Sequence, residues 1–150
     1  MDNKFVIIGA VANADIRDGN QVFTQFLKDN VKDIEVRRID YGPGPIMAMD
    51  WRIIMDSASL LGNIVTIAGT LWAAYEKFVI PSKKENAFIF VQIKNDEGRF
   101  VQFTIGQEHK DKDVFIKTFV NDVESITVDS NTIRIEKKST TTIQINENKR

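Results

Sequence analysis

The alternation of hydrophobic and polar residues predicts a strand, a helix and a second strand in the first third of the chain. Phe5–Ala12 is a short run of almost only apolar residues, which is typical of a central strand with both faces buried. Asp18 comes three residues before Gln21 and just ahead of an apolar stripe at helical spacing, which indicates a capped helix. Ile34–Asp40 then alternates apolar and charged side chains, as a strand with one wet face does.

A long helix is predicted next, over Met49–Phe78, because this stretch holds no proline before Pro81. We expect it to bend or divide near Gly62 and Gly69, since glycine weakens a helix. One side of this helix is polar and carries Asn63, Thr66, Thr70 and Lys77. The other side is apolar and carries Leu60, Leu61, Ile64, Val65, Ala68, Leu71, Trp72 and Tyr75.

The second half of the chain predicts a hairpin, a short helix and further strands. Phe88–Lys94 and Arg99–Ile105 both alternate, and the turn between them ends at Gly98, which tolerates a positive φ. A short amphipathic helix is expected at Val114–Phe119. The last three predicted strands are Ser125–Val128, Thr132–Glu136 and Thr141–Ile145.

Together these elements predict an α+β fold, a mixed, mainly antiparallel sheet with helices packed on one face. A length of 150 residues suits one domain, which we place at residues 1–146, followed by a polar tail at 147–150. The content of 43% hydrophobic and 27% charged residues is that of a globular protein, so we expect the chain to fold on its own.

The stretch Ser57–Tyr75 raises the question of a membrane span. It holds no charged residue, and its length is close to the roughly 20 residues that a span needs. Serine, threonine, asparagine and glycine dilute its hydrophobicity, and a polar side gains nothing in lipid. We therefore expect this helix to cover a sheet. A membrane-associated regulator with a single span at 57–75 is the alternative.

Charge and cysteine content narrow the classes of partner and compartment. The 20 basic and 21 acidic residues give a formal charge of -1 and no broad positive field, so nucleic acid is not an expected partner. The lack of cysteine excludes disulfides and thiolate metal sites and agrees with a reducing compartment. Met1–Lys4 has no feature of a signal peptide. We expect a cytoplasmic protein.

Candidate catalytic and metal-binding residues are few. His109, the one histidine, lies in a charged loop and lacks a second histidine or an evident serine partner. Asp15 and Asp18 follow the first strand, where two carboxylates can hold Mg²⁺ or act as acid and base. The favoured interpretation is a surface position for Asp15 and a helix cap for Asp18. The sequence predicts no enzyme, no metal site and no cofactor, and a small ligand-binding domain using the two aspartates is an alternative.

Aromatic residues on the predicted hairpin allow two interpretations. Exposed rings on a sheet can stack nucleic-acid bases, and the candidates are Phe88, Phe90, Phe100 and Phe103. Their spacing is also that of core residues, and the net charge disfavours nucleic acid. We expect all four to pack in the core.

The loop around residues 41–51 is the most distinctive segment of the sequence. Prolines make its backbone rigid, and large apolar side chains that lose little entropy on binding are preferred at protein interfaces. A structural elbow with its apolar side chains under the helix is the alternative. The predicted interaction residues are Tyr41, Pro43, Pro45, Met47, Met49 and Trp51.

The order of these features resembles a family of small bacterial proteins, the effector-associated constant components of biological conflict systems. The resemblance covers roughly Tyr41–Val120. It rests on Gly42, Pro43, Gly44 and Pro45, then Met47 and Met49, a helix rich in small residues that ends near Leu71, Trp72 and Ala73, and the hairpin Phe88–Ile105. It implies a non-catalytic adaptor or regulatory module in a bacterial defence or signalling assembly, with a protein partner such as an effector. Strands with unpaired edges also allow pairing with another chain, so a homo-oligomer is a further expectation.

Overall fold

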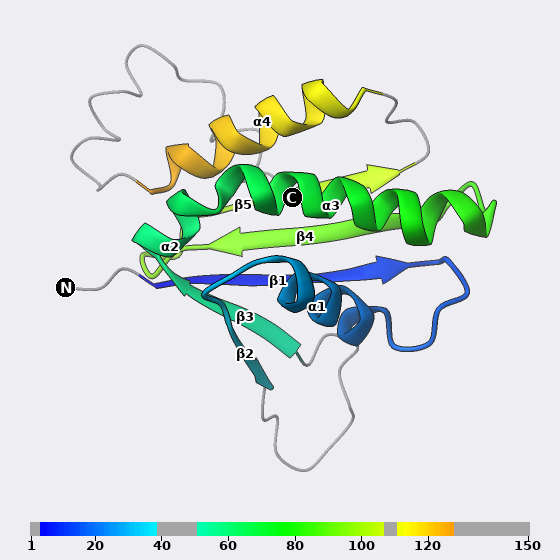
Figure 1. Cartoon of the computed structure of the whole chain (residues 1–150), viewed down its shortest axis with the longest axis horizontal. Helices are drawn as coiled ribbons and strands as arrows, with labels where there is room; N and C mark the ends of the chain where they lie inside the picture. Colours follow the sequence, from blue (N-terminus) through cyan, green and yellow to red (C-terminus); the bar gives the residue numbers. More distant parts are fainter. Residues whose placement is uncertain (1–3, 39–50, 107–110, 128–150) are drawn as a thin grey trace.

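The computed structural model describes residues 4–38, 51–106 and 111–127 of the chain (Figure 1). The strands are β1 (Lys4–Ala12), β2 (Glu35–Arg38), β3 (Trp51–Asp56), β4 (Phe88–Lys94) and β5 (Phe100–Gly106). The α-helices are α1 (Gly19–Asn30), α2 (Ser57–Gly62), α3 (Ile64–Ala74) and α4 (Lys112–Ser125). A π-helical turn at Tyr75–Val79 and a 3₁₀ turn at Ile80–Ser82 extend α3.

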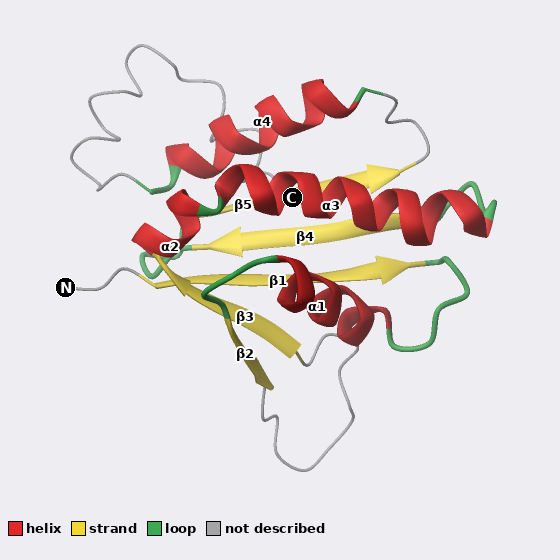
Figure 2. Cartoon of the chain, in the orientation of Figure 1, coloured by secondary structure: helices red, strands yellow, loops and turns green. Residues whose placement is uncertain are grey.

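The described strands form one sheet in the order β2-β3-β1-β4-β5, and all four pairs of neighbours are antiparallel (Figure 2). Strand β3 lies between β1 and β2, which α1 connects. This is the split β-α-β arrangement of the ferredoxin-like topology, here extended by β5 and α4. The predicted α+β class with a mainly antiparallel sheet is confirmed.

Helices α1, α3 and α4 lie on the same face of the sheet (Figure 1), which we call the covered face. Strand β1 alternates strictly, and its odd-numbered side chains, such as Phe5 and Ile7, are buried under these helices. Helix α4 joins the core through stacked rings, and its Phe119 ring centroid is 5.0 Å from that of Phe103 on β5. The core is thus built between one sheet face and three helices.

The segment predicted as one long helix differs from the prediction at its beginning. Residues 51–56 form β3, and the helix begins only after Asp56, whose carboxylate accepts a hydrogen bond from the Ser59 backbone N–H at 2.8 Å. The division expected near Gly62 is present, because α2 and α3 are separated at Asn63, but α3 continues straight through Gly69.

The predicted polar and apolar sides of this helix are partly wrong. Thr70 was placed on the wet side, but it is 8% exposed and lies in the interior. Leu61 and Val65 were placed on the buried side, but they are 42% and 60% exposed. The helix is interrupted at Asn63, so the side that each residue occupies in α3 cannot be worked out by continuing the helical spacing of α2. Within the described residues, no helix has the length and apolar content needed to cross a bilayer.

The predicted hairpin is confirmed as β4 and β5. Its turn is organised by the Asn95 side chain, whose Oδ1 accepts from the backbone N–H groups of Glu97 and Arg99 at 2.9 Å, while Gly98 has φ 89°. The Asn95 amide also donates to the Ile126 carbonyl at 3.2 Å and holds the end of α4 against the turn. Helix α4 is longer than predicted and includes Ser125, so a strand beginning there is wrong. The strands predicted at 132–136 and 141–145 lie outside the described residues.

Candidate interaction surface

The face of the sheet opposite the covered face carries a second set of apolar side chains, and we call it the open face. The pairing register places these side chains on the same side, away from α1, α3 and α4. Each is partly exposed, and none belongs to the hydrophobic core. They are Val6, Ile8, Ala10 and Ala12 of β1, Ile54 of β3, Phe88 and Phe90 of β4, and Phe100 of β5.

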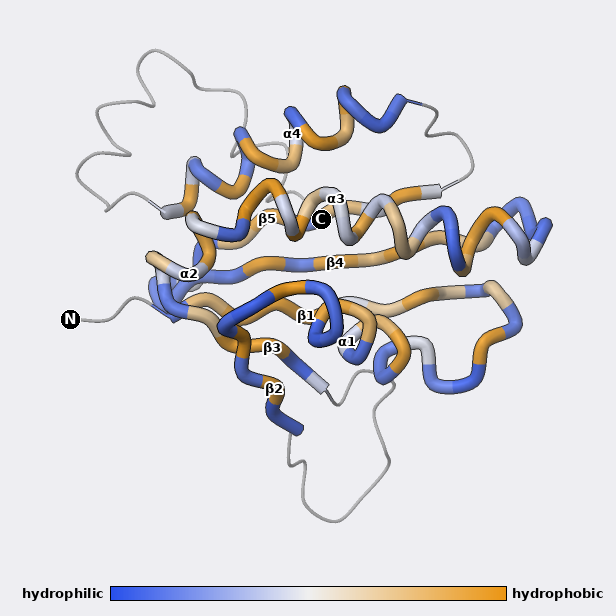
Figure 3. The backbone as a smooth tube through the Cα atoms, in the orientation of Figure 1, coloured by the Kyte–Doolittle hydropathy of each residue, from blue (hydrophilic) through white to orange (hydrophobic). Residues whose placement is uncertain are grey.

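Seven of these eight residues lie on β1 or directly beside it, and we call them the apolar stripe. They are the four even-numbered β1 residues from Val6 to Ala12 together with Ile54, Phe88 and Phe90. Ile54 lies opposite Val6, and the two phenylalanines lie opposite Ala12 and Ala10. Figure 3 shows β1 as hydrophobic along most of its length, because apolar residues occupy both of its faces.

Two arginines lie side by side at the β2–β3 end of the open face. Arg37 and Arg52 are direct partners in the β2–β3 register, and like charges in this position repel each other. Arg37 forms an ion pair with Glu35, and both side chains are more than half exposed. The Nε atom of Arg52 is buried and has no hydrogen-bond partner among the described residues. Among the residues that the structure describes, this corner therefore carries two arginines and one carboxylate, that of Glu35.

The β4–β5 side of the open face is mixed in character. Lys94 is exposed and lies opposite both Val6 and Phe100. Next to it, Gln92 donates to Gln102 across the two strands at 3.2 Å. The apolar stripe is thus bordered by cationic and amide side chains, a combination of apolar centre and polar rim that protein interfaces share.

Asn20, the second residue of α1, determines where the pairing of β1 with β3 ends. Its side chain is 1% exposed and donates to the carbonyls of Gly9 at 2.8 Å and Trp51 at 3.0 Å. Its Oδ1 accepts from the Trp51 backbone N–H at 2.7 Å. The regular ladder stops at the Ile7–Ile53 pair, so this amide replaces the next peptide group between the strands.

Of the six predicted interaction residues, Trp51 is the one that the structure describes. It begins β3, is partly exposed, and has the Arg38 guanidinium 5.7 Å from its ring centroid. The other five, Tyr41, Pro43, Pro45, Met47 and Met49, lie outside the described residues, and so does His109. Trp51 has the side-chain parity of Ile53, so it points to the covered side of the sheet and does not join the apolar stripe.

The expectation that all four hairpin phenylalanines belong to the core is wrong for three of them. Phe103 lies on the covered face and stacks on α4. Phe88, Phe90 and Phe100 have the opposite parity and lie partly exposed on the open face. When both faces of a strand carry apolar residues, alternation does not show whether the odd-numbered or the even-numbered side chains are buried. That depends on the face on which the helices pack.

The two aspartates near the first strand do not converge on a common site. The Asp18 carboxylate accepts from the Gln21 backbone N–H at 3.1 Å and caps α1, as expected. Asp15 forms an exposed ion pair with Lys84 at 2.8 Å. Within the described residues, no group of three histidine, aspartate or glutamate side chains is arranged to hold a metal ion.

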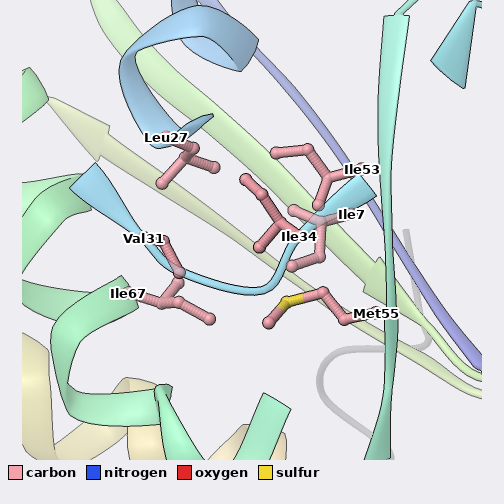
Figure 4. A pocket seen from close by; sticks show the side chains of 7 residues that line it. All are labelled: Ile7, Leu27, Val31, Ile34, Ile53, Met55 and Ile67. Carbon is pink, nitrogen blue, oxygen red and sulfur yellow. The ribbon is translucent and has the colours of Figure 1, made fainter. Parts of the chain in front are cut away.

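A small gap lies in the core between α1, α3 and the sheet (Figure 4). It is lined entirely by apolar side chains and has no room for a water molecule, so it is a packing gap rather than a ligand site. Its lining residues are Ile7, Leu27, Val31, Ile34, Ile53, Met55 and Ile67.

The Asp56 carboxylate has a lowered pKa. The hydrogen bond from the Ser59 backbone N–H lowers the pKa of Asp56 below its ordinary value, helped by the Ser59 side chain and by the positive charge of Lys4. Asp56 caps α2, and its ionised form is therefore the one that stabilises the helix.

Comparison of the chain with family models, with curated proteins and with solved structures found no match. The resemblance to the effector-associated family therefore stays a prediction from the sequence motifs.

Proposed function

We propose that this chain is a non-catalytic adaptor that binds a protein partner through the open face of its sheet. The observation that supports the proposal is the apolar stripe. Seven apolar side chains lie together and partly exposed on a face that α1, α3 and α4 do not cover. Contiguous apolar surface with a polar rim is the usual mark of a protein-binding site.

The dimensions of the stripe suit such a role. From Val6 to Ala12 the stripe extends about 20 Å along β1, which fits within a protein-binding site of ordinary size. Aromatic anchors contribute most to binding when they are desolvated at the centre of an interface. Phe90 occupies such a position, since β1 and β5 flank its strand and Ala10 lies opposite it.

The finer parts of the proposal come from the sequence. The resemblance to effector-associated proteins suggests an effector protein as partner, in a bacterial defence or signalling assembly. The segment Tyr41–Trp51 is a second proposed contact, because it concentrates rigid backbone and large apolar side chains. We propose the cytoplasm as the compartment, since a chain without cysteine agrees with a reducing environment.

Affinity purification of the tagged chain from its native host tests this proposal. Partners that copurify with the wild type are identified by mass spectrometry, produced separately, and titrated against purified variants. We expect Phe90→Ser to weaken binding of the reconstituted partner at least about ten-fold, because an aromatic anchor is worth about 2 kcal/mol or more. Thr104→Ala is the matched control, because Thr104 is exposed and lies directly opposite Phe90.

The outcomes separate the two proposed contacts. Equal affinity of the wild type and Phe90→Ser for every reconstituted partner would rule out the open face as the binding site. Trp51→Ala tests the contact around residues 41–51 in the same titration. A loss with Trp51→Ala and none with Phe90→Ser would move the site to that segment. Circular dichroism of each variant verifies that the fold is intact.

A further inference from the structure

The uncompensated charge on the open face indicates what kind of surface it accepts. Arg52 lies next to Arg37, and its buried Nε has no hydrogen-bond partner among the described residues. With a second arginine beside it, the Arg52 guanidinium offers a partner's carboxylate a charge-assisted hydrogen bond. A partner with an acidic group at the β2–β3 side of the apolar stripe therefore complements this face.

The shape of the stripe indicates how that partner is built. The stripe runs along β1 from Val6 to Ala12 for about 20 Å, and a helix of about 14 residues has the same length. On the covered face, α3 lies along β4 in the same manner (Figure 1). Ala10 and Ala12 have short side chains at the C-terminal end of the stripe, with Phe90 and Phe88 beside them, so a helix can come close to the sheet there.

We propose that the open face binds an amphipathic helix of the protein partner, lying along β1 with an acidic flank toward Arg52 and Arg37. This rests on the proposed function and specifies the chemistry of the partner. The apolar side of the helix covers the stripe, and a carboxylate accepts from the Arg52 guanidinium. The helix completes a layer on the open face like the one that α1, α3 and α4 form on the other.

Base stacking by single-stranded nucleic acid is the competing use of exposed rings on a sheet. The central strand of the open face presents valine, isoleucine and alanine, which form an aliphatic surface and not a stacking platform. The formal net charge of -1 also gives no general attraction for phosphate. The observations therefore favour a helix.

Two synthetic peptides of about 20 residues test the proposal. Both carry the same apolar stripe at helical spacing. One has glutamate along the flank and the other has lysine. Each is labelled and titrated with the full-length chain by fluorescence anisotropy, using the wild type, Arg52→Glu, Phe90→Ser and the control Thr104→Ala.

We expect the wild type to bind the glutamate peptide about ten-fold more tightly than the lysine peptide, the ratio that one charge-assisted hydrogen bond supplies. Arg52→Glu should abolish or reverse this preference. Phe90→Ser should weaken both peptides, whereas Thr104→Ala should leave both unchanged. A preference that survives Arg52→Glu overturns the acidic flank.

Several outcomes identify another occupant of the open face and overturn the helix. Binding of neither peptide means that a different surface is recognised or that the chain itself fills the face. A homodimer that Phe90→Ser dissociates assigns the face to a second copy. Tight binding of a single-stranded RNA oligonucleotide that Phe90→Ser removes assigns it to nucleic acid.

Failure of this inference is distinguishable from failure of the proposed function. If a reconstituted native partner loses affinity for Phe90→Ser while neither peptide binds, the adaptor function stands and the helix is wrong. If that partner binds Phe90→Ser normally, the adaptor surface itself is wrong.

Discussion

The covered face and the open face of the sheet are both apolar along β1, and they differ in their surroundings. The described helices pack on the odd-numbered positions of β1 and not on the even-numbered ones. Two consecutive residues illustrate the difference. Gly9 is buried against Phe23 on the covered face, whereas Ala10 lies beside the partly exposed Phe90 on the open face. Apolar composition therefore does not distinguish a core surface from a binding surface, whereas the cost of changing a side chain does.

The largest expected difference is between two phenylalanines on opposite faces. Phe119 is fully buried in the core, and Phe119→Ala should lower the free energy of unfolding by about 3–5 kcal/mol through the cavity that it leaves. Phe90→Ala removes a partly exposed ring and should cost less, about 1–2 kcal/mol. Urea unfolding of both variants measures the difference. Similar losses would mean that the open face is part of the core.

A smaller loss is expected where Asn20 joins the two central strands. Asn20→Ala removes the partner of the Gly9 carbonyl and of the backbone N–H and carbonyl of Trp51. We expect the free energy of unfolding to fall by about 3 kcal/mol, because each buried polar group without a partner costs about 1–3 kcal/mol. Gln21→Ala, next along α1 and exposed, is the control and should stay close to the wild type. Wild-type stability of Asn20→Ala would show that water replaces the amide.

Two glycines sharpen the comparison further. A Cβ at Gly9 would collide with the backbone carbonyl oxygen of Phe90 and lie 2.5 Å from the Phe23 ring, so Gly9→Ala should destabilise by about 1–3 kcal/mol. A Cβ at Gly69 would meet nothing within 4 Å, so Gly69→Ala should stabilise α3 by about 0.5–1 kcal/mol. Thermal unfolding of the two variants should move in opposite directions. A loss with Gly69→Ala would indicate that another surface packs there.

The smallest effect expected is a pH dependence at the end of the open face. The pKa of Asp56 is lowered in the folded chain, so its charge stabilises the fold above the ordinary aspartate range, and this contribution is lost as the pH falls through the folded value. Asp56→Asn should be less stable than the wild type at pH 7. The difference should shrink below about pH 4, where an unfolded aspartate takes up its proton. A difference independent of pH would contradict a role for the charge.

Much of the fold could be predicted because its elements have clear local signals. The pattern of β1, the Asp18 cap of α1 and the Gly98 turn each depend on neighbouring residues, and each is present in the structure. Strand β3 is not recognised in the sequence because Ile53, Ile54 and Met55 are consecutive apolar residues without alternation, and such a short run cannot be told from the first turn of a helix. The carboxylate of Asp56 ahead of Ser59 was the signal that marks the true start of the helix.

The candidate site was less predictable, because it depends on which side the helices occupy. The apolar even positions of β1 were visible in the sequence, and they were interpreted as a buried second face. Whether helices cover one face or both is decided by the packing of α1, α3 and α4, which are far apart along the chain. The pairing of Arg37 with Arg52 likewise appears only once β2 and β3 are aligned.

The amide of Asn20 has a consequence for how this scaffold tolerates change. It binds both the backbone N–H and the backbone carbonyl of Trp51, so the point at which the chain re-enters the sheet is specified from within α1. A one-residue slip of β3 would break both hydrogen bonds and reverse its faces. Insertions, deletions or grafted sequences between Arg38 and Trp51 should therefore leave the framework intact, which makes that segment a natural place for recognition sequences to diversify.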